Sequence, residues 1–397
     1  MKGPLSGIRV VELAQFAAGP ALGLLLADMG ADVIKVEPPE GDPTRSRSLY
    51  DVRGQSAYFM HFNRGKRSVV LDLKSPQGKQ SLLDLLIRVD AFVTNLRPGK
   101  LEKLGLDYSS LQRLNARLVM TTVTGFGWDS PQRDLPSFDA LAQAVSGLMS
   151  VTGEPGQAPV IAGTTIGDLS GAMFGAMGTL GALVNRGVTG KGQHVDVGMA
   201  DSMAWLMGYP AAYYFASGVV PGPLGSGHEN ASPYGAYPTS DGKYLFVAAH
   251  HLWETFCSLI GLPALVHDER FRDRKGRLQH RAALDEAVRG VFVKRTRAEW
   301  QTLLESADIP CAPVNNVAEA FAEPSLRARG MRVRALHPDG GNYDAVGNPV
   351  KFSCASGESG PAPLLGGDTE NILLSVAGYD AERVASLLSS RAAAAAR

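Results

Sequence analysis

The sequence predicts an α/β protein with one large, mostly parallel sheet and a second, smaller α+β unit. The first part of the 397-residue chain alternates short β-branched runs with amphipathic segments, which is the pattern of βαβ crossovers with helices on both faces of a sheet. A chain of this length exceeds one ordinary hydrophobic core. Near residue 218 a stretch rich in proline and glycine marks a change of composition, and so a boundary between units.

The alternating elements of the first part follow one another closely. Strands are expected in GIRVVELA, ADVIKVEPP, RSVVLDLK, DAFVTNL and ARLVMTTVTGFG, and helices in PALGLLLADMG and SPQGKQSLLDLLIRV. PVIAGTTIGD also has the composition of a strand, and it precedes a long helix over 169–185, a turn in GVTGKGQ and a strand in HVDVGM. These patterns place the large sheet within residues 1–215.

Residues 216–328 are expected to form the smaller unit. It begins with the loop GVVPGPLGSGHENASPYG and continues with a hairpin in AYPTSDGKYLFVAAH, whose turn is Asp241-Gly242. Helical segments follow around 251–260, 281–293 and 297–306. The tail, 329–397, holds a strand in NYDAVGNPVKFS and two helices in TENILLSVAGYDAERVASLLSS, and we expect it to return to the first unit. Only the terminal RAAAAAR is low in complexity.

Charge and cysteine usage exclude several classes of protein. Lys plus Arg equals Asp plus Glu at 39 each, so no overall field attracts nucleic acid or an anionic membrane. Cys257, Cys311 and Cys354 form no CxxC pair and lie near no histidine at metal-ligand spacing, which predicts free thiols and no metal site. The start, MKGPLSGIRVVEL, lacks an apolar signal segment, and the helix after Asp168 is only weakly hydrophobic. A cytoplasmic protein without a membrane segment is therefore expected.

Asp168, in TTIGDLSGAMFGAMGTLGAL, has two compatible interpretations. As a helix N-cap its side chain accepts hydrogen bonds from the N–H groups of the first turn. As a carboxylate held ionised by the helix dipole it is a nucleophile that requires no separate base. The small residues Gly171, Gly175, Gly178 and Ala182 share one face of this helix, where close packing of another helix is the favoured role and approach of a ligand the alternative.

Three further features each allow a functional and a structural interpretation when only the residues are considered. VVELAQFAAGP contains only Gly19 of the three glycines in a dinucleotide fingerprint, although Glu37 falls where a ribose-binding acid is expected, so the signal for NAD is weak. The glycine-containing loop 225–227 is either a mobile cover over a site or a solvated linker. His228 is either a substrate contact or an ordinary surface histidine.

Several motifs in order along the chain resemble one family. They are LSGIRVVELAQFAAGP, LLADMGADVIKVEPPEGDPTR, NRGKRSVVLDLKSPQGK, DAFVTNLRPGKLEKLGLDY, IGDLSGAMFGAMGTLGAL, GKGQHVDVGMADSM, IPCAPVNNVAEA and PAPLLGGDT. Together they are similar to the class III CoA-transferases, also called the CaiB/BaiF family, over nearly the full length. Eight matches in the same order make coincidence a poor explanation.

The resemblance implies an interlocked homodimer whose subunits have a Rossmann-like large domain, built from both chain ends, and an inserted small domain; some relatives form heteromers instead. It also implies an acyl-CoA:carboxylate CoA-transferase in which Asp168 attacks the donor thioester, giving a mixed anhydride and then an aspartyl-CoA thioester. Acyl-CoA and a carboxylic acid are then substrates, with no permanently bound cofactor. The acids stay open, because relatives handle formate, oxalate, small dicarboxylates, carnitine-like and aromatic acids.

The resemblance also assigns residues to the site. The positions that match the CoA site are Ala17, Ala18, Leu71, Lys74, Asn95, Arg97, Lys103 and Leu104. The positions that match the glycine loop over the anhydride are Gly225, Ser226 and Gly227, and those of the substrate pocket are Phe138 and His228. Several relatives carry an arginine where this chain has Pro38, and Arg45, Arg97 or Lys100 is expected to replace it at the CoA phosphates.

Three alternatives accompany this reading. The α-methylacyl-CoA racemases of the same family need a base and an acid on opposite faces of the α-carbon, and they carry a histidine in a GHD motif. This chain has Ser137-Phe138-Asp139 there, and a phenylalanine cannot move a proton. From other classes, an NAD-dependent oxidoreductase and a non-catalytic CoA-binding subunit remain.

Overall fold

The computed structural model describes residues 3–353 and 360–396. Cys354, one of the three expected free thiols, lies outside the described residues, whereas Cys257 and Cys311 are free thiols. The chain divides into two compact units: a larger one with Met1–Leu148, Ile161–Gly218 and Pro324–Arg397, and a smaller one with Met149–Val160 and Val219–Glu323. From the sequence, residues 149–160 are expected in the larger unit. In the structure they cluster with the smaller one, where the carbonyl of Gly153 accepts a hydrogen bond from the N–H of Gly225 at 2.8 Å.

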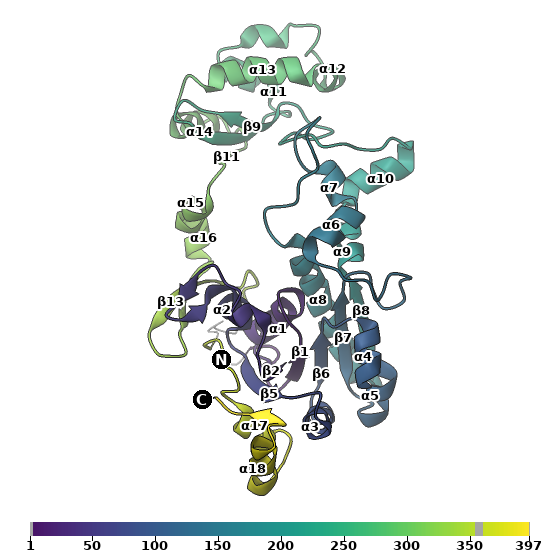
Figure 1. Ribbon diagram of the computed structural model, residues 1–397. Helices are drawn as coiled ribbons and strands as arrows, with labels where there is room; N and C mark the ends of the chain where they lie inside the picture. The colour runs from purple at the N-terminus through teal and green to yellow at the C-terminus, as the bar shows by residue number, and fades with distance from the viewer. Residues whose placement is uncertain (1–2, 354–359, 397) are drawn as a thin grey trace. The chain divides into compact units, whose positions relative to one another are not determined.

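A seven-stranded sheet forms the centre of the larger unit (Figure 1). Its strands are β1 (Arg9–Leu13), β2 (Asp32–Glu37), β5 (Arg67–Leu71), β6 (Ala91–Thr94), β7 (Val119–Thr124), β8 (His194–Gly198) and β14 (Ala393–Ala394). They lie in the order β14-β5-β2-β1-β6-β7-β8. All neighbouring pairs are parallel except β14 with β5, which is antiparallel. The expected α/β class with a mostly parallel sheet is confirmed.

The strand order reverses beside β1. From β1 the chain first builds β2 and β5 on one side, and it then builds β6, β7 and β8 on the other. In open sheets of this kind, ligands bind outside the carboxyl ends of the strands, next to the point where the order reverses. The loops that follow β1 and β6 are therefore the places to look for a site.

Helices pack on the sheet to form two separate hydrophobic cores. The helices of the larger unit are α1 (Ala18–Asp28), α2 (Ala57–Asn63), α3 (Pro76–Leu86), α4 (Pro98–Leu104), α5 (Tyr108–Leu114), α6 (Asp139–Val145), α8 (Ile166–Thr189), α9 (Met199–Leu206), α10 (Gly208–Ser217), α16 (Pro324–Ala328), α17 (Thr369–Ser375) and α18 (Ala381–Ser389). A further short helix, α7 (Leu148–Val151), begins at the edge of this unit.

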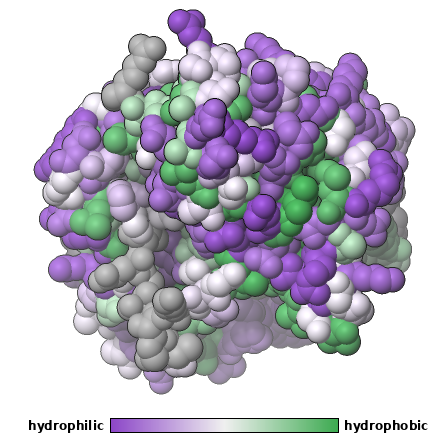
Figure 2. Space-filling model, turned by 90° about the horizontal axis from the view of Figure 1, so that it is seen from below, coloured by the Kyte–Doolittle hydropathy of each residue, from purple (hydrophilic) through white to green (hydrophobic). Residues whose placement is uncertain are grey.

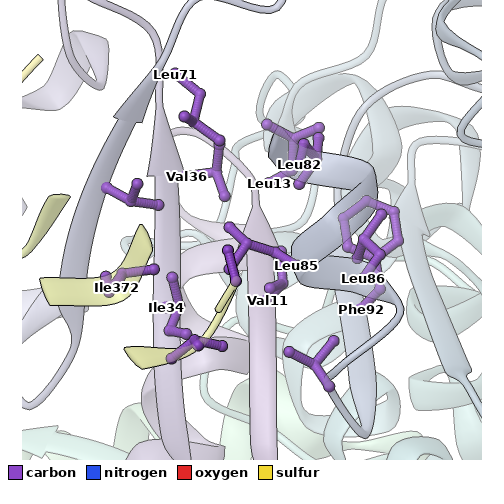
Figure 3. Packing of buried hydrophobic residues seen from close by; sticks show 14 of the residues in the cluster. Val11, Leu13, Ile34, Val36, Leu71, Leu82, Leu85, Leu86, Phe92 and Ile372 are labelled. Carbon is purple, nitrogen blue, oxygen red and sulfur yellow. The ribbon is translucent and has the colours of Figure 1, made fainter. Parts of the chain in front are cut away.

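Consecutive strand residues point to opposite faces, so the two cores alternate along each strand. Val11 belongs to the core under α3, α17 and α18, whereas Val10 belongs to the core under α1, α8 and α9. Figure 3 shows the first of these cores, in which Leu82, Leu85 and Leu86 of α3 face the strands.

The helix α8 is longer than the expected 169–185 at both ends, and it ends at Gly190 in a left-handed conformation. Its small residues allow neighbouring elements to pack closely against it, which is the role favoured from the sequence. A Cβ atom on Gly175 would lie 2.4 Å from Leu22 of α1, and one on Gly178 would lie 2.5 Å from Val195 of β8. The expected strand in PVIAGTTIGD does not form. Instead the N–H of Ala162 bonds to the side chain of Gln143 at 2.9 Å.

The tail returns to the larger unit, as expected. It contains the two-stranded pair β12 (Arg332–Leu336) and β13 (Asn342–Val346), then α17, α18 and β14. The strand β14 falls in the low-complexity end, where no strand is expected. There Ala393 pairs with Leu71 of β5, and the N–H of Asp72 donates to the carbonyl of Ala392 at 3.0 Å.

The smaller unit contains a three-stranded antiparallel sheet and a helical layer. Its strands are β9 (Tyr234–Pro238), β10 (Tyr244–Ala248) and β11 (Cys311–Pro313), and its helices are α11 (Trp253–Leu259), α12 (Arg274–Gln279), α13 (Arg281–Phe292), α14 (Arg297–Glu305) and α15 (Val317–Ala322). The hairpin around Asp241-Gly242 is confirmed. In the described ranges, no helix of either unit has the length and apolar character of a membrane span.

Candidate active site

Two adjoining cavities lie along the carboxyl edge of the large sheet. One measures about 310 Å³ and is lined by the residues that follow β1, β2 and β5, together with part of α4. The other measures about 550 Å³ and is lined by the residues that follow β1, β6 and β7, together with residues from the starts of α2, α6 and α8. Gln15, Leu96 and Lys100 line both cavities. The two spaces therefore meet beside β1 and β6, where the strand order reverses.

Asp168 lines the larger cavity. It is the third residue of α8, whose N-cap is Thr165, so the expectation that Asp168 caps the helix is wrong. The cap comes from another helix: Oδ1 of Asp139, in α6, accepts hydrogen bonds from the N–H groups of Gly167 at 2.6 Å and Asp168 at 3.3 Å. Because Asp139 occupies these donors, the carboxylate of Asp168 is left to face the cavity.

The electrostatic environment of Asp168 also differs from the expectation of a carboxylate held ionised by the helix dipole. Burial, followed by the negative charge of Asp139, raises the pKa of Asp168 to about 7. A helix N-terminus favours a nearby anion, but here Asp139 takes the backbone donors, and its charge opposes a second one. Asp168 is therefore largely ionised only above neutral pH.

Aromatic and cationic side chains complete the wall of the larger cavity. Tyr58 stands in the first turn of α2, and burial together with the charge of Asp168 raises its pKa to about 12. Phe138 is 65% exposed and also faces the cavity. Arg97 and Lys100 lie three residues apart at the start of α4, and Nη1 of Arg97 donates to the carbonyl of Asp134 at 2.8 Å.

The structure brings most residues assigned to the CoA site onto this groove. Leu71, Lys74 and Leu104 line the smaller cavity, and Ala18, Asn95 and Arg97 line the larger one. Asn95 fixes the turn after β1, because its side chain accepts from the N–H of Gln15 at 3.0 Å and donates to the carbonyl of Gln15 at 2.7 Å. Two assigned residues are not among the lining residues: Ala17 is buried at the N-cap of α1, and Lys103 is exposed on α4.

Arg45 does not supply a free cation for phosphates. Its Nη2 pairs with Oε1 of Glu37 at 2.7 Å, and its guanidinium lies 3.7 Å from the ring centroid of Phe59. Glu37 is 1% exposed and also accepts a hydrogen bond from Ser68 at 2.6 Å. Since its oxygens are engaged inside the protein, Glu37 is a poor ribose ligand, which removes the main residue that favoured NAD.

A buried ion network lies next to the groove. Nζ of Lys35 is 3.0 Å from Glu12, 2.9 Å from Asp42 and 2.9 Å from the carbonyl of Ala14, which lines the smaller cavity. Nζ of Lys66 is 2.7 Å from the second oxygen of Glu12. Burial opposes a charge on Lys35, but Glu12 and Asp42 outweigh it and raise the pKa of Lys35. The network holds the end of β1 and the loop after β2 in place.

The loop 225–227 belongs to the smaller unit. Gly225 has a φ of 58°, which favours glycine, and a Cβ atom on Gly227 would lie 2.8 Å from Nη1 of Arg281. Oγ of Ser226 accepts from the N–H of Ala236 at 2.9 Å, and Nδ1 of His228 accepts from the N–H of Asn230 at 3.1 Å. Within the described part of the chain, no three His, Cys, Asp or Glu side chains gather as metal ligands.

Gln15, Tyr58 and Asp139 line the larger cavity but were not assigned to the site from the sequence. Gln15 was accessible to prediction, because it follows the first strand of the sheet, where ligands bind. Asp139 falls at the aspartate position of the racemase motif, but its role as a cap gave no local signal, since the backbone that it caps lies 28 residues further along the chain.

A parallel sheet with this strand order, a groove along its carboxyl edge and a partly buried carboxylate in that groove define an α/β enzyme that binds its ligand beside β1 and β6. The model of CoA-transferase family III matches residues 5–369. The chain therefore belongs to CoA-transferase family III, the CaiB/BaiF family.

Two named relatives and one solved structure are similar to this chain over most of its length. Succinate–glutarate CoA-transferase of Agrobacterium fabrum is 36% identical over 94% of this chain and 95% of its own. Acetyl-CoA:oxalate CoA-transferase of Acetobacter aceti is 35% identical over 89% of this chain and 90% of its own. The crystal structure of a CaiB/BaiF family protein from Brucella suis has a TM-score of 0.85 and 35% identity, covering 95% of this chain and 100% of that one.

Proposed function

We propose that this chain moves CoA from a donor thioester to an acceptor carboxylic acid through covalent intermediates on Asp168. The observation that carries the proposal is the position of Asp168: a carboxylate at the start of α8 that faces the 550 Å³ cavity beside β1 and β6. Family membership and the named relatives support the overall reaction. The local geometry supports the choice of nucleophile.

In the proposed reaction, Oδ of Asp168 attacks the acyl carbon of the donor, a C–O bond forms, the C–S bond breaks, and the electron pair leaves with CoA thiolate. The thiolate then attacks the Asp168 carbonyl of the mixed anhydride and expels the donor acid, leaving an aspartyl-CoA thioester. The acceptor acid repeats these two steps in reverse order. One negative charge is conserved throughout, so no external base is required.

We propose that the two cavities receive the two ends of a CoA thioester. We place the nucleotide in the 310 Å³ cavity, whose wall includes Pro38, Leu71 and Leu104, with Lys74 at its exposed rim. The pantetheine arm then passes Gln15 and Leu96 toward Asp168. Among the lining residues of the larger cavity, Phe138 replaces the histidine of a racemase and none is a histidine, which disfavours proton transfer at the α-carbon. From the family resemblance, we propose the loop 225–227 as the cover of the anhydride.

Trapping tests the nucleophile directly. When the protein is mixed with acyl-CoA and hydroxylamine, the activated carboxyl of Asp168 is expected to be converted to a hydroxamate, which peptide mass spectrometry locates. The same mixture without acyl-CoA is the control, because a free carboxylate does not react. Active transferase that yields no modification at Asp168, or yields one at another acid, contradicts the proposal.

A dicarboxylic acid is the acceptor class that the charges of the larger cavity favour. Asp168 and Asp139 line it together with two cations, Arg97 and Lys100. No cation is among the causes of the pKa shift of Asp168, and Arg97 and Lys100 come from α4, whereas Asp168 comes from α8. One carboxylate of the acceptor can then react while the other pairs with a cation. Succinate, glutarate and oxalate, in the names of the relatives, share this chemistry.

Lys100→Gln tests the acceptor class. We expect the KM for glutarate to rise about tenfold, the effect of losing one charge-assisted hydrogen bond, while the KM for butyrate stays unchanged. Lys191→Gln removes the same charge from an exposed turn outside both cavities and is the matched control. A KM for acyl-CoA that rises equally with every acceptor would instead assign Lys100 to the CoA phosphates.

The interlocked homodimer is proposed on the exposed apolar surface of the larger unit. The helix α10 has no buried residue, and it carries Tyr209, Tyr213, Tyr214 and Phe215 at 40–80% exposure. The face that Figure 2 shows mixes hydrophilic and hydrophobic residues. Several large aromatic side chains exposed on one helix are a feature of protein interaction surfaces. Light scattering is expected to give twice the mass of one chain; a mass of one chain at micromolar concentration contradicts it.

A further inference from the structure

The carboxylate of Asp139 holds the turn that carries Asp168. Its Oδ1 accepts from the N–H of Gly167 at 2.6 Å and from that of Asp168 at 3.3 Å. The N-cap residue Thr165 makes no side-chain cap of its own. Because the first N–H groups of a helix have no partner within it, Asp139 supplies the cap that α8 lacks.

Gln143 extends this attachment by one turn of α6. It is fully buried, its Nε2 donates to Oδ2 of Asp139 at 2.6 Å, and its Oε1 accepts from the N–H of Ala162 at 2.9 Å. Asp139 and Gln143 together therefore bind the segment 162–168 to α6. The backbone of the proposed nucleophile is fixed at both ends of this segment.

Asp139 also acts on the side chain of Asp168 through its charge. Burial is the larger cause and the charge of Asp139 the second cause of the raised pKa of Asp168. The other titratable groups on the cavity wall are Tyr58 from α2, and Arg97 and Lys100 from α4. Tyr58 has a raised pKa and is neutral at physiological pH, and neither cation contributes to the shift at Asp168. The net influence on a negative Asp168 is therefore repulsive.

We propose that Asp139 is a positioning residue that fixes the first turn of α8 and, by its negative charge, favours the acylated form of Asp168 over the free carboxylate. The inference rests on the proposed function. When Asp168 attacks the thioester, its charge passes to the departing thiolate, and the anhydride left beside Asp139 is neutral. Repulsion by Asp139 therefore favours acylation for the same reason that it favours protonation.

Neutral and charged replacements of Asp139 separate the two roles. Asp139→Asn and Asp139→Ser each keep an oxygen that can cap Gly167 but remove the charge, whereas Asp139→Glu keeps the charge. Gln143→Leu weakens the attachment of α6 without changing any charge, and it also measures the loss of the contact at Oδ2. For each variant, kcat/KM for acyl-CoA is measured against pH, because this parameter reports ionisation in the free enzyme.

In the wild type, kcat/KM is expected to rise up to about pH 7 and then level off, since the protonated acid is not a nucleophile. With Asn or Ser the rise is expected to end about one pH unit lower, and the hydroxamate trapped at Asp168 in one turnover at pH 8 falls severalfold. Asp139→Glu and Gln143→Leu are expected to keep the wild-type midpoint, the latter with a lower plateau.

A midpoint that stays at its wild-type value in both neutral variants overturns the inference and leaves Asp139 a structural cap. Trapping in the wild type distinguishes this outcome from failure of the proposed function. If the wild type forms no hydroxamate at Asp168, the nucleophile is wrong. If it does and the midpoints coincide, only the role of Asp139 is wrong.

Discussion

Asp168→Asn is expected to abolish CoA transfer and, at pH 8, to stabilise the folded protein. Loss of the proposed nucleophile removes the proposed covalent route and should lower kcat by at least about a thousandfold. The stability of the folded variant is expected to rise, because the folded wild type holds Asp168 in an environment that opposes its ionisation. A misfolded variant would lose both activity and stability, so the combination is specific to a strained active-site charge.

The pH dependence of this stabilisation follows from the direction of the pKa shift. The pKa of Asp168 is about 7 in the folded protein against about 3.9 for an aspartate in an unfolded chain, so between these values the folded state binds more protons and the free energy of unfolding falls as pH rises. Above pH 7 the full cost is present, about 2–4 kcal/mol, and Asn removes it. Calorimetry should show a Tm higher by about 5 °C at pH 8 and no difference near pH 3. A variant less stable than the wild type at pH 8 contradicts the prediction.

Lys35→Met is expected to destabilise the larger unit more than any surface substitution. The side chain of Lys35 is fully buried and neutralises Glu12 and Asp42. Methionine fills a similar volume but leaves two carboxylates without this partner, and removal of one member of a buried ion network costs about 3–5 kcal/mol. The Tm of the larger unit should fall by at least about 6 °C, with weaker CoA binding because the carbonyl of Ala14 loses its donor.

Arg332→Ala is the matched comparison for Lys35→Met. Arg332 pairs with Asp344 in the same unit, but its side chain is 55% exposed, so water replaces the lost partner and the Tm is expected to stay close to that of the wild type. Equal destabilisation by the two substitutions would show that the buried ion network contributes no more to the free energy of unfolding than an exposed ion pair does.

Most strands and helices of the larger unit were predictable, because each one carries a recognisable pattern in its own residues. Parallel strands such as β1 and β7 are short, mostly buried runs rich in β-branched residues. Helices such as α3 begin with a Ser-Pro pair that caps and starts them, with Ser75 accepting from the N–H of Gly78. The edge strand β14 was missed because two alanines carry no strand signal. It forms only because β5 presents an open edge.

The sequence predicted a site residue when the local motif around that residue carried the signal. It did not predict a contact between residues that lie far apart in the chain. Asp168 stands out beside a glycine-rich helix, but its true cap, Asp139, comes from a separate helix. Arg45 looks like a free cation in the sequence, yet it is held by Glu37 inside the protein. Both errors have one cause: long-range pairing decides which charges stay available to a ligand.

The position of β14 places Ala393 and Ala394 beside the groove of the larger unit. Ala393 braces Leu71, which lines the smaller cavity, and Ala392 holds the N–H of Asp72. Because β14 follows the other six strands of the large sheet in the chain, it is synthesised after them, and a nascent chain forms the rest of the sheet with this wall still open. Any segment attached directly after β14 would therefore lie beside the wall of the smaller cavity.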